Sequence, residues 1–303
     1  MVAASVATRW GRDLQKVEMA ITTTLKNGIN KVLAPFNIAI ETRTVERKEQ
    51  QRLKSLYAGG HFSKEAFAVL PQFLASDPAP ILTAVDRFRD ITGRFSRPEQ
   101  SDMYSFHNDY FSSPDAEVAY AMLRGLKSQT LVEVGSGNST LLFREAIRDG
   151  SIETKLVSID PAPRKSVEAT ADRIMKCRLE QVSLCEFQSL RENDILFIDS
   201  SHEVHIGNDV NRLILEIMPN LQKGVVIHIH DIFLPFEYPR EWMIDEFRRW
   251  NEQYLVQALL QDSDRFEVLW PGHFLQRTLP NFARHFSPEI LGRASSLWLR
   301  KRT

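Results

Sequence analysis

From about residue 113 onward, the sequence alternates between short apolar runs and stretches with helical spacing. The clearest apolar runs are "TLVEVG", "KLVSIDP", "DILFID" and "GVVIHIHDI". Between the last two, apolar residues recur every three or four positions, at Ile206, Val210, Leu213, Ile214 and Ile217. Nearly continuous apolar strands are buried on both faces, and strands joined by helices run parallel. The alternation therefore predicts an α/β fold with one parallel sheet between two layers of helices, which binds ligands at the carboxyl ends of its strands.

The same pattern predicts several further elements. We expect helices over 164–177 and 240–260, a third strand over 180–187, and closing strands over 266–270 and 296–301. The residues 271–295 then form a long insertion between the closing strands.

Residues 1–34 carry an apolar stripe of the kind that an amphipathic helix buries. Its members are Val6, Trp10, Leu14, Val17, Ile21, Leu25, Ile29 and Val32. The opposite face mixes acidic and basic residues, which favours packing on the same domain or on a second copy of the chain over a membrane-surface role. The stripe therefore suggests a homodimer through this helix.

The overall composition limits the classes of partner. The 303 residues carry a formal net charge of −1, which argues against a general binder of nucleic acid or of anionic membranes. No apolar run approaches the roughly 18–20 residues that span a bilayer. Cys177 and Cys185 form no disulfide or zinc pattern and fit a reducing compartment. We expect a cytoplasmic location, since the N-terminus lacks the apolar core of a signal peptide.

Two of the expected strand ends carry residues that suit a nucleotide-like ligand. After the first strand, "EVGSGNST" places Gly135 and Gly137 where the backbone can approach a ligand closely. After the second, Asp160 can accept hydrogen bonds from ribose hydroxyls, although it could equally cap the helix that follows. The two features together are more specific than either alone. A dinucleotide fingerprint would have a third glycine at the position of Thr140, so this sequence favours an adenosyl cofactor.

As a set, the strand-end motifs resemble those of class I S-adenosylmethionine-dependent methyltransferases. The motifs are "LVEVGSGNST", "LVSIDP", "LFIDSSH" and "GVVIHIHDI", and the resemblance covers about residues 105–300. It implies a Rossmann-like, seven-stranded sheet whose last strand is antiparallel to the rest. It also implies a helical accessory or cap region over 1–105, a methyltransferase domain over 106–303 and the cofactor S-adenosyl-L-methionine.

The resemblance carries cofactor-binding roles onto individual positions. Glu133, Gly135 and Gly137 would contact the methionine part, Asp160 would hold the ribose, and residues 188–190 would lie near the adenine. The set expected at the cofactor is Glu133, Gly135, Ser136, Gly137, Ser139, Asp160, Pro161, Asp199 and Ser200.

His202, His230 and Asp231 are the expected catalytic residues, because the strands that they follow are neighbours in this fold. Histidine accepts a proton at neutral pH, as methylation of a hydroxyl requires. Alternatively, Asp199, His230 and Asp231 would hold a divalent metal that acidifies the hydroxyl. Similar metal-dependent methyltransferases carry an amide ligand where this chain has Ile232, so both interpretations stay open.

The resemblance implies methylation of a small molecule. We expect O-methylation of a sugar or secondary metabolite, as in natural product biosynthesis, with no nucleic-acid or membrane partner. Two alternatives stay open. One is N-methylation of an imidazole, amine or peptide, and the other is a cofactor-binding scaffold without turnover. A methyltransferase core is compatible with many acceptors.

Overall fold

The computed structural model describes residues 23–38, 40, 44–97, 103–163 and 165–303. The chain divides into two compact units, residues 1–56 and residues 57–303. In the first unit, residues 23–33 are helical, and Leu25, Ile29 and Val32 of the apolar stripe are exposed. The rest of the stripe lies outside the described residues, and the homodimer stays a prediction. The short helix η1 (Ala34–Phe36) and most of α2 (Thr44–Ala58) complete this unit.

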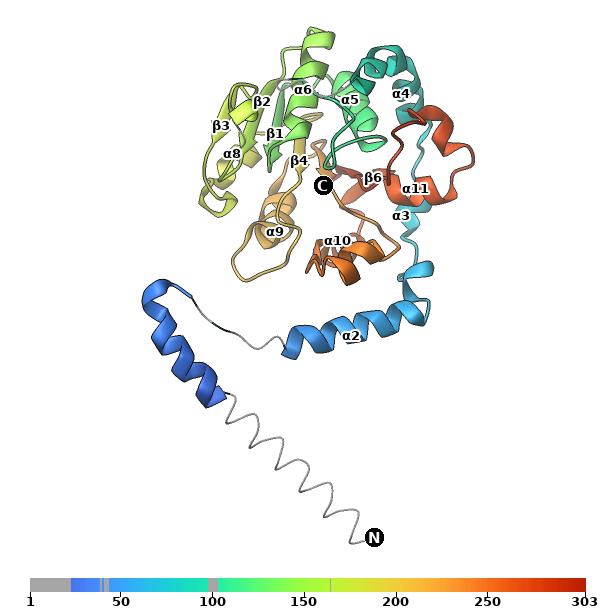
Figure 1. Cartoon of the computed structure of the whole chain (residues 1–303). Helices are drawn as coiled ribbons and strands as arrows, with labels where there is room; N and C mark the ends of the chain where they lie inside the picture. Colours follow the sequence, from blue (N-terminus) through green and yellow to red (C-terminus); the bar gives the residue numbers. More distant parts are fainter. Residues whose placement is uncertain (1–22, 39, 41–43, 98–102, 164) are drawn as a thin grey trace. The chain divides into compact units, whose positions relative to one another are not determined.

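The second unit contains a seven-stranded sheet, as predicted (Figure 1). The strand order is β3-β2-β1-β4-β5-β7-β6; β1 to β5 are mutually parallel, and β7 is antiparallel to β5 and β6. The strands are β1 (Thr130–Val134), β2 (Lys155–Ile159), β3 (Arg173–Met175), β4 (Ile195–Ile198), β5 (Val226–Ile229), β6 (Phe266–Pro271) and β7 (Leu297–Lys301). The order reverses between β1 and β4, which is where such sheets bind ligands. The antiparallel β7 confirms the fold class.

Each central strand contributes to two cores, one on each face of the sheet. Leu131, Leu156, Ile195 and Val226 pack with α4, α5 and α6, whereas the next residue of each strand packs with α8, α9, η5 and α10. This division follows from the two-residue period of strand side chains. The helices are α4 (Ala79–Thr92), α5 (Asp115–Leu126), α6 (Asn138–Gly150), α8 (Leu184–Gln188), α9 (Asp209–Arg212), η5 (Leu213–Ile217) and α10 (Glu252–Leu260). The predicted two layers of helices are confirmed.

Part of the predicted accessory region packs against the sheet. Helix α3 (Pro71–Leu74) contributes Phe73 to one core, and α4 contributes Leu82 and Val85 to the other. The described residues from 57 onward thus form one compact unit with the strands, and the functional boundary at residue 105 stays a prediction. Among the described residues, no helix is both long and apolar enough to cross a bilayer.

The predicted helix over 164–177 and strand over 180–187 are wrong. Only α7 (Lys165–Glu168) is helical in the first segment, which ends in β3, and the second segment forms η4 (Leu179–Gln181) and α8. Strand β3 is the sheet edge beside β2 and is half-buried. It therefore lacks the apolar run that marks the central strands, and this explains the misassignment.

The predicted long helix over 240–260 is also wrong, because the chain breaks in its middle. The segment 240–260 consists of η7 (Glu241–Asp245) and α10, with Phe247 at φ +52° between them. The N–H groups of Asn251 and Glu252 at the start of α10 donate to the backbone carbonyl of His202. The break therefore ties α10 to the loop that carries a predicted catalytic residue. The predicted insertion after β6 is confirmed and contains α11 (Gly272–Thr278) and η8 (Phe282–His285).

Candidate active site

The turn after β1 packs its backbone against the end of β4. Gly135 has φ +82°, and a Cβ at this position would lie 1.9 Å from the carbonyl oxygen of Asp199. Only glycine fits such a contact. At Gly137 an added Cβ would meet no atom within 4 Å, which leaves space for a ligand to approach the backbone. The loops after β1 and β4 therefore form one continuous wall.

Glu133 lies beneath this turn and is fully buried. Its carboxylate accepts hydrogen bonds from the hydroxyls of Ser139 (2.5 Å), Thr140 (2.5 Å) and Ser158 (3.0 Å). Burial raises the pKa of Glu133 to about 7, although the hydrogen bonds from these three donors lower it. The carboxylate therefore fastens the start of α6 to β1 and β2 and holds the turn in shape. With no exposed surface, it reaches a ligand only through the turn that it supports.

Asp160, at the end of β2, joins the same wall. One carboxylate oxygen accepts from the backbone N–H of Ser136 (3.0 Å) and from its hydroxyl (2.6 Å). The other accepts from the N–H of Ala162 at 2.7 Å. Asp160 is half-buried, so its oxygens retain capacity to accept hydrogen bonds from a bound hydroxyl.

A cleft of ≈770 Å³ opens along these strand ends. It contains six of the predicted cofactor residues, namely Gly135, Ser136, Asp160, Pro161, Asp199 and Ser200. Glu133, Gly137 and Ser139 lie behind or beside it and do not line it. Residues 178–180, which the sequence did not mark, line the cleft in place of the expected 188–190. We call it the cofactor cleft.

Four predicted residues converge beside it, at the ends of β4 and β5. The Nε2 atom of His202 lies 3.2 Å from Asp199 Oδ1 and 3.6 Å from Asp231 Oδ2. The Nδ1 atom of His230 lies 3.4 Å from Asp199 Oδ1 and 3.7 Å from Asp231 Oδ2. His202 and Asp231 both have left-handed backbone, at φ +59° and +56°, a strained conformation that is common in active sites. We call these four residues the His/Asp cluster.

A second cleft, of ≈1130 Å³, lies on the other side of the cluster. Its wall is rich in aromatic side chains and includes Phe106, Tyr110, Phe233, Trp242 and Trp250. Asp199 and Ser200 line this cleft as well as the cofactor cleft. The hydroxyl oxygen of Ser200 is buried and has no hydrogen-bond partner in the described part of the chain. We call this the acceptor cleft; the His/Asp cluster stands where the two clefts meet.

A comparison with protein families matches the core of this region. Residues 132–232 match the model Methyltransf_24, which is described as a methyltransferase domain. The matched segment contains the turn after β1, Asp160 and all four residues of the His/Asp cluster, and it lies in a sheet of the class I order. Over these residues, the chain resembles a methyltransferase domain. Among proteins with curated descriptions, none matches the sequence.

Several solved structures resemble the chain at low identity. An apo structure of CmcI is 17% identical over 64% of this chain and 72% of its own, with a TM-score of 0.39. Methyltransferase PaMTH1 from Podospora anserina, bound to S-adenosylhomocysteine, is 17% identical over 73% and 88%, at 0.37. The O-methyltransferase TomG from Streptomyces achromogenes is 12% identical over 73% and 90%, at 0.40.

Two carboxylates that the sequence analysis missed support the histidines of the His/Asp cluster. Glu252, at the start of α10, is fully buried and lies 3.1 Å from Nδ1 of His202. Asp115, at the start of α5, accepts hydrogen bonds from the backbone N–H and hydroxyl of Ser295, and this hydroxyl lies 3.2 Å from Nε2 of His230. Both acids come from segments outside the strand-end motifs, and polar residues flank Glu252 in "WNEQY", so no local pattern identifies them.

The cluster is a buried set of paired charges. Burial would lower the pKa of His202, but hydrogen bonds to Asp199 and Glu252 and the charge of Asp231 raise it to about 10. Burial likewise opposes the charge of His230, whose pKa is nevertheless held well above its usual value by Asp231, Asp199 and Asp115. Burial would raise the pKa of Asp199, but the two histidines hold it well below its usual range. Strong coupling of this kind is typical of functional sites.

His228, one strand repeat before His230, has a structural role. Its ring stacks on Phe197, with centroids 3.9 Å apart and planes at 7°, and its Nε2 lies 2.8 Å from the hydroxyl of Ser296. Complete burial holds its pKa well below the usual value, so it is a neutral core residue. His205, which we did not assign to catalysis, is exposed and pairs with Glu203.

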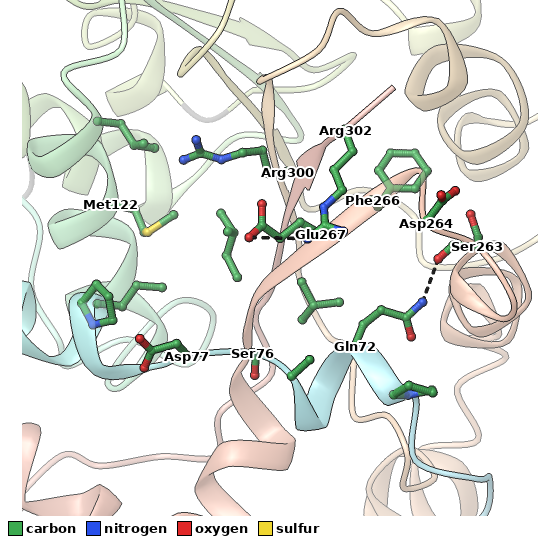
Figure 2. A pocket seen from close by; sticks show the side chains of 17 residues that line it. Gln72, Ser76, Asp77, Met122, Ser263, Asp264, Phe266, Glu267, Arg300 and Arg302 are labelled. Carbon is green, nitrogen blue, oxygen red and sulfur yellow. Dashed lines mark hydrogen bonds and ion pairs between the residues drawn. The ribbon is translucent and has the colours of Figure 1, made fainter.

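A third cleft, of ≈640 Å³, lies against the edge strand β6 and shares no lining residue with the other two clefts (Figure 2). Figure 2 shows Gln72 donating to the backbone carbonyl of Ser263, and Glu267 beside Arg302 at 3.9 Å. None of the predicted site residues lines it. The predicted chemistry is therefore confined to the cofactor and acceptor clefts.

Proposed function

We propose that the chain is an S-adenosylmethionine-dependent methyltransferase that methylates an oxygen atom of a small molecule. The observation that carries this proposal is the shared wall of the two clefts at Asp199 and Ser200. A sulfonium methyl group bound in the cofactor cleft would face the acceptor cleft at the His/Asp cluster. The cluster thus lies where methyl transfer and proton removal must both take place.

The residues of the cofactor cleft fit an adenosyl cofactor. Asp160 stands at the rim with oxygens free to accept from ribose hydroxyls, and the glycine turn lets backbone groups come close to the methionine part. The unpartnered hydroxyl of Ser200 is a buried polar group that a ligand would satisfy. Glu133 and Ser139 would then act through the shape of the turn.

Bound S-adenosylmethionine supplies an electrophilic methyl group. The chain has to orient the acceptor hydroxyl so that its oxygen attacks the methyl carbon as the carbon–sulfur bond breaks and sulfur keeps the electron pair. The hydroxyl proton passes to the Asp231 carboxylate, because the raised pKa values of His202 and His230 keep both rings protonated at neutral pH. His202, His230 and Asp231 all line the acceptor cleft, and His202 Nε2 lies 3.6 Å from Asp231 Oδ2. Asp199, His230 and Asp231 are also the residues that would hold a divalent ion.

The shape and lining of the acceptor cleft favour a small ring compound. Its volume suits a drug-sized ligand. Trp242 and Trp250 lie 5.1 Å apart, with the Arg248 guanidinium over both rings at 4.4 and 4.5 Å. Aromatic walls of this kind bind flat or sugar-like rings by stacking. We therefore retain a sugar or secondary metabolite as the acceptor class.

Isothermal titration calorimetry with S-adenosylmethionine and S-adenosylhomocysteine tests the cofactor. We expect both to bind the full chain at one site, and Asp160→Ala to weaken binding at least tenfold. Asp90→Ala is the control, because Asp90 is exposed on α4 and lines neither cleft. A folded wild-type sample that binds neither compound would rule out the proposal.

A methyl-transfer screen with labelled cofactor against extract fractions tests the reaction. Mass spectrometry of the product distinguishes a methylated oxygen from a methylated imidazole, amine or peptide nitrogen. Cofactor binding without transfer to any fraction would instead identify a scaffold.

A further inference from the structure

We propose that the acceptor carries a carboxylate in addition to the hydroxyl that is methylated, and that Arg248 binds this carboxylate. The inference rests on the proposed function, because it names the substrate class of the same site. Arg248 lines the acceptor cleft together with Trp242 and Trp250, and it lies outside the His/Asp cluster. Its role would be to select the acceptor and not to take part in methyl transfer.

The break at Phe247 places Arg248 in the cleft. Phe247 has left-handed backbone at φ +52°, which separates η7 from α10. The N–H of Arg248 donates to the backbone carbonyl of Trp242 at 2.8 Å, and its guanidinium lies over the rings of Trp242 and Trp250 at 4.4 and 4.5 Å. Stacking on two aromatic rings fixes the plane of a guanidinium. Arg248 is therefore held in place before a ligand arrives, which lowers the entropic cost of binding.

The guanidinium of Arg248 keeps donors that a ligand can use. Its Nε atom donates to the carboxylate of Glu246 at 2.6 Å, whereas its two terminal Nη atoms have no hydrogen-bond partner among the described residues. Glu246 is exposed and does not line the cleft, so this surface ion pair contributes little to stability. Two Nη donors in one plane match the two oxygen atoms of a carboxylate.

The path from Arg248 to the His/Asp cluster passes over a single aromatic ring. The ring of Trp250 lies 4.5 Å from the Cζ atom of Arg248 and 4.3 Å from the ring of His202. His202 in turn lies 3.6 Å from Asp231, the proposed proton acceptor. The N–H of Asn251 donates to the backbone carbonyl of His202 at 3.0 Å, which holds the two ends of this path together. A ring compound with a hydroxyl on one side and a carboxylate on the other can therefore reach Asp231 and Arg248 at once.

The charges around the cleft favour a group with one negative charge. The acids of the His/Asp cluster lie within 3.7 Å of its histidine rings, so their charges are offset inside the cleft. Arg248 pairs with an acid outside the lining, and a bound anion would complete its pairing inside the cleft. Glu246 already places one negative charge beside this guanidinium, so a phosphate with nearly two charges would meet more repulsion than a carboxylate.

Calorimetry with paired probe compounds tests this inference on the full chain saturated with S-adenosylhomocysteine. The first pair is 4-hydroxybenzoate and 4-hydroxybenzamide, which differ in charge but share the ring and the hydroxyl. The second pair is methyl glucuronide and methyl glucoside. We expect at least one acid to bind about tenfold more tightly than its neutral partner, or better. Arg248→Gln should remove this preference and leave the binding of the neutral partner and of S-adenosylhomocysteine unchanged, a difference that a purely structural role of Arg248 would not produce.

Arg240→Gln is the matched control. Arg240 also pairs with an acid, Asp245 at 2.6 Å, and lies over an aromatic ring, that of Tyr57 at 4.6 Å, but it lines neither cleft. This variant should keep the preference for the acid. Three results would each overturn the inference: equal binding of acid and neutral compound in both pairs, no binding of any of the four compounds, or tighter binding of 4-hydroxyphenyl phosphate than of 4-hydroxybenzoate.

The methyl-transfer screen separates failure of this inference from failure of the proposed function. The acceptor should be found in the extract fractions that an anion exchanger retains at pH 7, and transfer should be lost after the carboxylates of those fractions are converted to methyl esters. Transfer confined to unretained fractions would overturn the inference and leave the proposed function standing. Absence of transfer to every fraction would overturn the proposed function and this inference with it.

Discussion

At the scale of single residues, Gly135 carries the contact between the turn after β1 and the end of β4. Gly135→Ala should lower the free energy of unfolding by at least about 2 kcal/mol, because a Cβ would meet the Asp199 carbonyl and the backbone has positive φ. Urea unfolding of the full chain measures the loss. In the control Gly125→Ala, an exposed helix position with no atom near the new Cβ, stability should stay equal or rise by about 0.5–1 kcal/mol. Equal losses in both variants would contradict this explanation.

A substitution at Asp231 should affect methyl transfer without affecting cofactor binding. Asp231 lines the acceptor cleft and not the cofactor cleft, so Asp231→Asn should reduce methyl transfer by about 100-fold or more and leave the affinity for S-adenosylhomocysteine unchanged. Turnover with an acceptor from the screen and calorimetry measure the two effects. Asp109→Asn, in the same cleft but outside the cluster, should retain most of the activity. Full activity of Asp231→Asn would remove this residue from the mechanism.

At the scale of elements, Glu117 makes the packing of α5 dependent on pH. Burial raises its pKa from 4.5 to about 7, so the folded state binds the proton more tightly than the unfolded state. The contribution of Glu117 to the free energy of unfolding should therefore be largest below pH 4.5. It should fall by up to about 3 kcal/mol as the pH rises to 7. Glu117→Gln keeps an acceptor for the Ser113 hydroxyl, which lies at 2.8 Å, and should remove this loss.

Denaturant unfolding at several pH values measures the difference between wild type and Glu117→Gln. The two curves should converge below about pH 4.5 and separate as the pH rises to about 7, with the variant more stable. Glu289→Gln, an exposed acid, shows the effect of removing a surface charge. Parallel curves for wild type and Glu117→Gln would refute the assignment.

The sequence was most informative where an element is buried on both faces. β1, β2, β4 and β5 have continuous apolar runs. The polar residues that follow β4 and β5 were therefore recognisable as site candidates: Asp199, His202, His230 and Asp231. The sequence did not indicate β3, because an edge strand buries little apolar surface and needs no continuous apolar run. The single helix predicted over 240–260 was wrong because the helical spacing of apolar residues continues across the break at Phe247. Glu252 and Asp115 contact the histidines only because the chain folds, and no local sequence pattern predicts such a contact.

At the scale of the whole molecule, cofactor binding should stabilise the folded chain. S-adenosylhomocysteine at about 100 times its dissociation constant contributes about 2.7 kcal/mol. This corresponds to a rise of roughly 5–10 °C in the melting temperature of a unit of this size. Thermal unfolding monitored by circular dichroism measures the rise. Asp160→Ala should lose most of it at the same ligand concentration, and an equal rise in that variant would show that the ligand binds elsewhere.

The origin of the acceptor-cleft wall has an evolutionary consequence. The His/Asp cluster is fixed by the ends of β4 and β5, whereas the aromatic wall comes from the loop before α5, the loop after β5 and the segment around the break at Phe247. Under the proposed function, substitutions in those segments should change which compound is accepted and leave the transfer step intact. The domain is thus suited to diversification of its substrates by exchange of three surface segments, and libraries directed at these segments are the natural starting point for altering its specificity.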